Sequence, residues 1–272
     1  MHYKFYCPHC KNYNLKFRQE QEFAGYDFLV PDLKENKREW IDCIDCNLSF
    51  STPRLSKRQL EYMYSNYRSE LFRGESPDEY FDRITNYPPE ESENFQKLAW
   101  IRDKITSKFN PNKILDIGSG GGVLLHTLGN IFLDADLFGV EPTSNFAELS
   151  SRRTRAEIVN GYFDDKTFID HQFNLITCCQ VLEHLENLND FVENVSNRLI
   201  KNGYLYIEVP DISDFQTLEI NHSRFSEPSH LWYFSSDFLC NNLFKNVFSI
   251  IDFTVIKTVR NRNNLMILFQ KD

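Results

Sequence analysis

Residues 113–125, with the sequence Lys-Ile-Leu-Asp-Ile-Gly-Ser-Gly-Gly-Gly-Val-Leu-Leu, constrain the fold more than any other stretch of this chain. The apolar residues before the glycines suit a buried parallel strand, and those from Val123 to Leu128 continue at helical spacing. Glycines permit positive φ angles and close backbone approach, and the helix that follows offers free N–H groups to a polar ligand. The sequence therefore predicts an α/β domain with a small-molecule site at this turn.

The spacing of the glycines narrows the choice of ligand. The dinucleotide fingerprint G-x-G-x-x-G needs a glycine at position 123, where this chain has Val123. The glycines instead follow the pattern G-x-G-x-G, at Gly118, Gly120 and Gly122. Asp116, at the end of the strand, would repel a pyrophosphate and attract an ammonium group. We therefore expect a cationic ligand and not NAD.

The segment Asp116-x-Gly118-x-Gly120-x-Gly122 resembles the first motif of the class I S-adenosylmethionine-dependent methyltransferases. The resemblance implies a doubly wound, seven-stranded, Rossmann-like α/β domain whose last strand is antiparallel. It also implies an enzyme that binds S-adenosylmethionine with these residues and transfers its methyl group. The simpler alternative is a tight strand–helix turn without a ligand.

Further cofactor contacts are expected where later strands end. Glu141 closes a strand predicted at 137–141, and an acid there can accept hydrogen bonds from ribose hydroxyls. The resemblance places Phe163 on the adenine ring and Asp164 at the adenine amino group, with Asp165 an equal competitor by spacing. Gln180 follows the strand predicted at 173–179, close to the methionine end of the cofactor.

Two histidines are candidates for acid–base catalysis. His184 lies in the sequence Val-Leu-Glu-His-Leu after the fourth strand, a form of this loop that the same family uses. His230 follows a long polar connection and begins the sequence His-Leu-Trp-Tyr-Phe-Ser, which resembles the acceptor-side motif of sugar methyltransferases. An imidazole can take a proton near neutral pH. The alternative for both is a structural role, His184 as a hydrogen-bonded loop residue and His230 at the start of a helix.

Two C-x2-C pairs near the N-terminus predict a structural metal site. Cys7 and Cys10 form one pair, and Cys43 and Cys46 form the other. Together they can supply four thiolates to one tetrahedral Zn²⁺, in a β-rich zinc ribbon. Redox-active or unliganded cysteines are the alternatives.

The sequence Phe-Ser-Thr-Pro-Arg at 50–54, followed by a tyrosine-rich helix, resembles the N-terminal part of bacterial methyltransferases in sugar and surface-polysaccharide pathways. Asn47 and Ser49 depart from the residues that many of those proteins carry. The resemblance implies a small-molecule sugar or glycan acceptor. Along the chain we expect a zinc ribbon at 1–60, a helical connector or lid at 61–93, and the methyltransferase domain at 94–272. Tyr64, Tyr67 and Tyr80 could form an aromatic wall over the cofactor, or belong to ordinary helix packing.

The distribution of charged residues helps to judge whether the protein binds nucleic acid. A formal net charge of −9 argues against broad binding to nucleic acid. The rival hypothesis is an RNA base methyltransferase that grips RNA with its zinc ribbon, since ten Lys and Arg face eight Asp and Glu through residue 58. A binding module that keeps the cofactor but has lost catalysis is a third possibility. Without a signal-type or membrane-spanning apolar run, we expect a cytoplasmic protein, and the sequence leaves its oligomeric state open.

Overall fold

The computed structural model describes residues 5–22, 37–66, 74–105, 109–220 and 222–272. Its centre is a seven-stranded sheet in the order β10-β11-β8-β7-β4-β5-β6. Five of these strands are parallel: β4 (Lys113–Ile117), β5 (Asp136–Glu141), β6 (Glu157–Asn160), β7 (Phe173–Cys179) and β8 (Leu199–Pro210). The closing hairpin of β10 (Phe248–Lys257) and β11 (Asn263–Lys271) joins the sheet with β11 antiparallel to β8.

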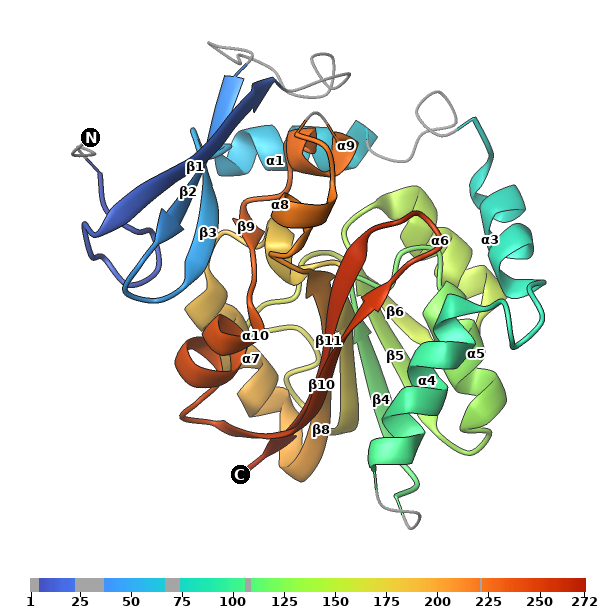
Figure 1. Cartoon of the computed structure of the whole chain (residues 1–272). Helices are drawn as coiled ribbons and strands as arrows, with labels where there is room; N and C mark the ends of the chain where they lie inside the picture. The colour runs from blue at the N-terminus through green and yellow to red at the C-terminus, as the bar shows by residue number, and fades with distance from the viewer. Residues whose placement is uncertain (1–4, 23–36, 67–73, 106–108, 221) are drawn as a thin grey trace.

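Helices cover both faces of this sheet (Figure 1). Helices α4 (Glu93–Lys104) and α5 (Val123–Ile131) lie on one face, and α7 (Leu188–Arg198) lies on the other. Successive residues of a strand point to opposite faces, so Ile114 joins the core with α4 and α5 while Leu115 joins the core with α7. The predicted doubly wound, seven-stranded α/β fold is confirmed.

The N-terminal residues form a second, four-stranded antiparallel sheet in the order β1-β2-β3-β9. Its first three strands are β1 (Leu15–Glu22), β2 (Lys37–Cys43) and β3 (Leu48–Thr52), drawn in blue in Figure 1. The fourth, β9 (Trp232–Tyr233), belongs to the part of the chain that follows the parallel strands, and it pairs with Ser49 and Phe50. A strand from the C-terminal half thus completes the N-terminal sheet. The domain boundaries at residues 60 and 93 remain predictions.

Two helices occupy the described part of the connector. Helix α1 spans Lys57–Asn66, and α3 spans Pro77–Thr85, where a capping box between Ser76 and Glu79 and a proline in the first turn favour helix formation. Helix α3 is tied to α6 (Ser144–Arg153), because Arg152 and Arg153 both donate to Asp78. Of the expected aromatic wall, Tyr67 and the side chain of Tyr64 lie outside the described residues.

The remaining short elements follow β7 and β8. They are η1 (Leu182–His184), α8 (Asp214–Thr217), α9 (Ser223–Ser226), α10 (Ser236–Phe238) and the π-helical turn η2 (Leu239–Leu243). The long connection at 211–229 therefore contains two short helices. Among the residues that the structure describes, no helix is long and apolar enough to cross a membrane.

Two boundaries differ from the sequence pattern. The pattern at 191–203 predicts a helix ending at Asn202-Gly203, but α7 ends at Arg198 because Leu199 is extended and pairs with Phe173 of β7. The run from Glu157 to Asp164 predicts a third strand that ends in an acid, but β6 ends at Asn160. Phe163 and Asp164 consequently lie in the loop after the strand.

Candidate active site

A cavity of about 1900 Å³ lies at the carboxyl ends of the parallel strands, the edge where open α/β sheets bind ligands. Most of the residues predicted to bind the cofactor line it: Asp116, Gly118, Gly120, Glu141, Phe163, Asp164 and Gln180. His184 and His230 line it as well. Gly122 is not among the lining residues, since it begins α5 and faces α6.

The glycine turn brings backbone close to its surroundings, as expected. Gly118 has a φ of +72°, and a Cβ there would lie 2.2 Å from Cγ2 of Val181. Gly122 has a φ of +84°, and a Cβ would lie 2.6 Å from Oγ of Ser150. Because both positions combine a left-handed backbone with a close neighbour, only glycine fits them. The turn leaves open space in front of β4 for a ligand.

Asp116 ends β4 inside this cavity, and only 3% of it is exposed. The Thr177 hydroxyl donates to its Oδ1 at 2.7 Å. Burial raises the pKa of Asp116 to about 7, against the opposing effects of Thr177 and Lys97. A buried carboxyl of this kind is stabilised in its ionised form when a cation binds beside it. Asp116 therefore suits a ligand with an ammonium or sulfonium group.

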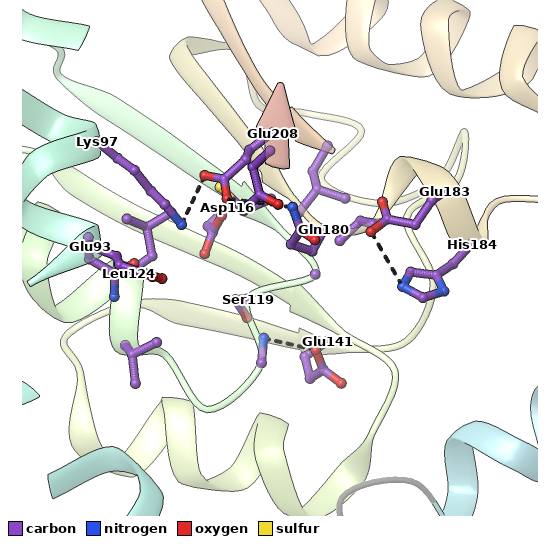
Figure 2. A pocket seen from close by; sticks show the side chains of 18 of the residues that line it. Glu93, Lys97, Asp116, Ser119, Leu124, Glu141, Gln180, Glu183, His184 and Glu208 are labelled. Atoms are coloured by element: carbon purple, nitrogen blue, oxygen red, sulfur yellow. Dashed lines mark hydrogen bonds and ion pairs between the residues drawn. The ribbon is translucent and has the colours of Figure 1, made fainter. Parts of the chain in front are cut away.

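Glu141 at the end of β5 is held by backbone amides. Its Oε2 accepts from the Gly120 N–H and its Oε1 accepts from the Thr143 N–H, each at 2.9 Å. The bond from Gly120 connects the glycine turn to β5 (Figure 2). A carboxylate has about four acceptor positions, so Glu141 can still accept from the hydroxyls of a bound ribose.

The loop after β6 brings Asp164, and not Asp165, to the cavity. Asp164 lines the cavity, while Asp165 is not among its lining residues and its carbonyl accepts from Arg198. Asp164 Oδ1 accepts from the Lys166 and Thr167 backbone N–H groups, and this fixes the local turn.

The two other predicted contacts lie nearby. Phe163 lines the cavity and packs edge-on against Phe191 of α7, with ring centroids 6.3 Å apart. Gln180 has a φ of +56°, its N–H donates to the Glu208 carbonyl at 2.7 Å, and its side-chain oxygen accepts from Arg224. The exit of β7 is thereby fixed to β8.

A buried ion pair beside Asp116 was not predicted from the sequence. Lys97 Nζ of α4 lies 2.9 Å from Oε2 of Glu208 in β8, and both side chains are largely buried. Glu208 also accepts from the Tyr206 hydroxyl and the Asn264 amide. Figure 2 shows Asp116 between this pair and Glu141. The available signals were a single acid within the apolar strand 204–210 and a lysine on the buried side of α4.

A cluster of Glu183, His184 and His230 forms another part of the cavity. Their ligand-type atoms all lie within 4.8 Å of one another. His184 Nδ1 lies 3.0 Å from the Ser229 carbonyl, and because a carbonyl only accepts, this nitrogen must bear the hydrogen. His184 Nε2 then lies 3.8 Å from Oε1 of Glu183 (Figure 2). The sequence placed both histidines here but missed Glu183, which precedes His184 in the same motif.

Burial sets the protonation states of this cluster. It raises the pKa of Glu183 to about 8. It lowers the pKa of His230 well below the ordinary value, and the charges of His184, Arg224, Arg38 and Arg262 lower it further. His230 Nδ1 is buried without a hydrogen-bond partner among the described residues. The cluster therefore contains a neutral imidazole near neutral pH.

The four N-terminal cysteines lie together, away from the cavity. Cys7 Sγ is 3.8 Å from Cys46 Sγ, Cys10 Sγ is 3.5 Å from Cys43 Sγ, and all four sulfurs lie within 4.8 Å of one another. Four thiolates bound to one Zn²⁺ at about 2.3 Å would be spaced about 3.8 Å apart. The donor set and its spacing thus fit a tetrahedral metal site.

Comparisons with known proteins agree on the nature of the large domain. A family model described as "Methyltransferase domain" matches residues 89–251, more than half of the chain. The ubiquinone biosynthesis O-methyltransferase of Glaesserella parasuis serovar 5 (strain SH0165) is 26% identical over 192 residues, covering 60% of this chain and 80% of that protein. The mitochondrial enzyme of the same name from Schizosaccharomyces pombe is 30% identical over 105 residues, covering 36% of this chain and 38% of that protein.

A solved structure supports the fold. Magnesium protoporphyrin IX methyltransferase from Synechocystis PCC 6803, with bound SAH, matches 80% of this chain and 100% of its own with a TM-score of 0.56 at 11% identity. The family match, the seven-stranded sheet and the cavity at the glycine turn all point to one class of enzyme. The chain belongs to the methyltransferase domain family and is an S-adenosylmethionine-dependent methyltransferase.

Proposed function

We propose that this enzyme methylates a hydroxyl group of a small-molecule acceptor, with His230 as the residue that takes the proton. One observation supports this most directly: the Glu183, His184 and His230 cluster shares a single cavity with Asp116 and Glu141. A cofactor at the glycine turn and an acceptor near the histidines would therefore meet in one space. Two curated relatives that are named O-methyltransferases also support an oxygen acceptor.

The cofactor would lie along the strand ends. Asp116 would contact the ammonium group, Glu141 the ribose hydroxyls, and Phe163 and Asp164 the adenine. Lys97 adds a cation beside Asp116, where the cofactor carboxylate would lie. When bound, S-adenosylmethionine supplies an activated methyl group on a sulfonium.

This chain's own residues would align the acceptor and move one proton. Methyl transfer from a sulfonium depends mainly on holding the two reactants in line. An acceptor hydroxyl must also lose its proton, and His230, a neutral imidazole that lines the cavity, is our candidate to receive it. His184 is the second candidate, because the Ser229 carbonyl orients its ring with Nε2 facing Glu183.

A sugar is our favoured acceptor. The cavity beside His230 is lined by polar side chains that suit a molecule rich in hydroxyls: Ser223, Arg224, Arg262 and Asn264. The resemblance of the 230–235 segment and the N-terminal region to sugar-pathway methyltransferases supports the same class. A quinol is the second candidate, because the curated relatives are named for ubiquinone biosynthesis.

An RNA acceptor has less support. Three basic side chains of the N-terminal sheet contact other parts of the same chain: Arg18 pairs with Asp42, Lys37 with Glu20, and Arg38 is 1% exposed. Phosphate binding needs accessible cations.

We also propose one structural Zn²⁺ at Cys7, Cys10, Cys43 and Cys46, on the basis of the sulfur spacing. Thiolate ligands persist in a reducing compartment, so the cytoplasm is the proposed location.

Labelled cofactor tests the proposal. The enzyme would be incubated with labelled S-adenosylmethionine and, separately, with sugar nucleotides, extracted glycans, a hydroquinone and RNA. We expect label in a sugar-containing fraction, and His230→Ala should lower turnover by roughly 10²-fold at unchanged SAH affinity. Transfer to RNA alone, or full turnover by His230→Ala, would overturn the assignment.

A further inference from the structure

Arg38 links the N-terminal sheet to the turn that bears His230. It lies in β2, it is 1% exposed, and its guanidinium reaches residues nearly two hundred positions later in the chain. Its Nη1 donates to the carbonyls of Phe225 at 3.3 Å and Glu227 at 2.6 Å. Its Nη2 donates to the carbonyl of His230 itself. One buried side chain thus contacts three carbonyls of a single turn.

Neighbouring groups of the same sheet strengthen this contact. Trp40 donates from Nε1 to the Phe225 carbonyl at 3.3 Å, and the Arg38 guanidinium lies 4.4 Å from the centre of the Trp40 ring. The Ser51 N–H donates to the Leu231 carbonyl at 3.1 Å, just before β9 pairs with β3. The turn at 225–231 is therefore held along one side by β2 and β3.

The other side of the same turn holds the acid–base cluster. The Leu231 N–H donates to the Glu183 carbonyl at 2.8 Å, and the Ser229 carbonyl faces His184 Nδ1 at 3.0 Å. The rings of His184 and His230 lie edge to face, 4.8 Å between centroids. A shift of this turn would move both imidazoles relative to each other.

We propose that Arg38 is a positioning residue of the methyl-transfer site, which holds the 225–231 turn so that His230 and His184 face each other. This inference rests on the proposed function of the two histidines. It also assigns a role to the N-terminal sheet, whose strands β2 and β3 support the 225–231 turn. Three directed hydrogen bonds need the fork of a guanidinium, which a lysine cannot reproduce.

Arg38 also acts on His230 through its charge. Burial lowers the pKa of Arg38 to about 9, so the side chain is still protonated at neutral pH. Its positive charge helps to keep the pKa of His230 low. The other titratable groups that face His230 come from η1, α9, the turn before β11, the 225–231 turn and β9; they are Glu183, His184, Arg224, Arg262, Glu227 and Tyr233. Substituting Arg38 alone removes none of these groups.

Histidine NMR can separate position from charge without knowledge of the acceptor. The full-length protein would carry ¹⁵N-labelled histidine, with His184 and His230 assigned from single substitutions and SAH present as the probe of an intact cofactor site. We expect Arg38→Met to raise the pKa of His230 and to weaken the Nδ1 hydrogen-bond signature of His184. Arg38→Lys keeps the charge, so it should leave the His230 pKa low while still changing the His184 signature.

Lys37→Met is the matched control, because it removes one positive charge from the adjacent, exposed position in β2. If both histidine signals in Arg38→Met match those of the parent and of Lys37→Met, the inference is wrong. Should Arg38→Met fail to bind SAH, Trp40→Phe removes the bond to the Phe225 carbonyl and reduces the packing on Arg38, and it must show a smaller change of the His184 signature; no change there overturns the inference equally. Altered histidine signals together with full turnover by His230→Ala would refute the proposed function and leave the role of Arg38 standing.

Discussion

Replacing Asp116 with asparagine should raise the free energy of unfolding of the protein and lower its affinity for the cofactor. Burial raises the pKa of this carboxyl from 3.8 to about 7. Asparagine has nearly the same shape, can keep the hydrogen bond from Thr177, and never ionises. The substitution therefore removes the electrostatic cost of a buried carboxylate without opening a cavity.

The sign of the effect follows from proton binding. Between about pH 4 and pH 7 the folded protein keeps the Asp116 proton while the unfolded chain releases it, so the parent loses stability as the pH rises through this range. The pKa difference corresponds to a free energy on the order of 4 kcal/mol, which is fully lost above pH 7. Asp116→Asn should thus match the parent near pH 4 and exceed its free energy of unfolding by an amount of that order at pH 8.

Urea denaturation at pH 4.5, 6 and 8 measures the difference, with Asp134→Asn as a control at an exposed aspartate. Calorimetry with S-adenosylmethionine should show weaker binding by Asp116→Asn, and only the parent should gain affinity as Asp116 ionises around pH 7. A stability difference that is the same at all three pH values would refute the reasoning about burial. Unchanged cofactor affinity would refute the reasoning about the ammonium group.

Two other substitutions test the remaining predicted ligands. Glu141→Ala should weaken S-adenosylmethionine binding by roughly 1–3 kcal/mol in calorimetry, because ribose hydroxyls lose a charged acceptor; Glu148→Ala, at an exposed position of α6, should bind normally. Cys43→Ser should reduce the zinc content from one atom per chain and lower the thermal midpoint, whereas Cys240→Ser should keep the metal. A metal-free parent, or Glu141→Ala with parental affinity, would contradict these assignments.

The features that could be predicted from the sequence are those that a local residue pattern reveals. The glycine turn after residue 117, the acid after the second strand and the two cysteine knuckles are recognisable because strand, turn and helix signals lie within a few residues of each other. The parallel sheet then brings the strand ends together without further information. Hence most of the predicted cofactor residues line one cavity.

The residues that were missed acquire their importance from distant partners. Lys97 and Glu208 look like an ordinary helix lysine and a strand acid until α4 and β8 pack together and pair them. Arg38 is one of several charged residues in its part of the sequence, yet its three hydrogen-bond acceptors lie in the 225–231 turn. Pairing of β9 with β3 is equally invisible, because a two-residue strand has no periodicity to detect.

The shared strand β9 also limits how such a protein can be divided or recombined. A shortened chain that began after the N-terminal sheet would leave β9 without its partner strand and would expose the buried side chains around Trp232 to solvent. An unpaired apolar edge of this kind invites aggregation. A gene fusion that exchanged the N-terminal sheet between related enzymes would therefore have to exchange the 223–234 segment with it. The two stretches, although distant in the sequence, can be replaced only together.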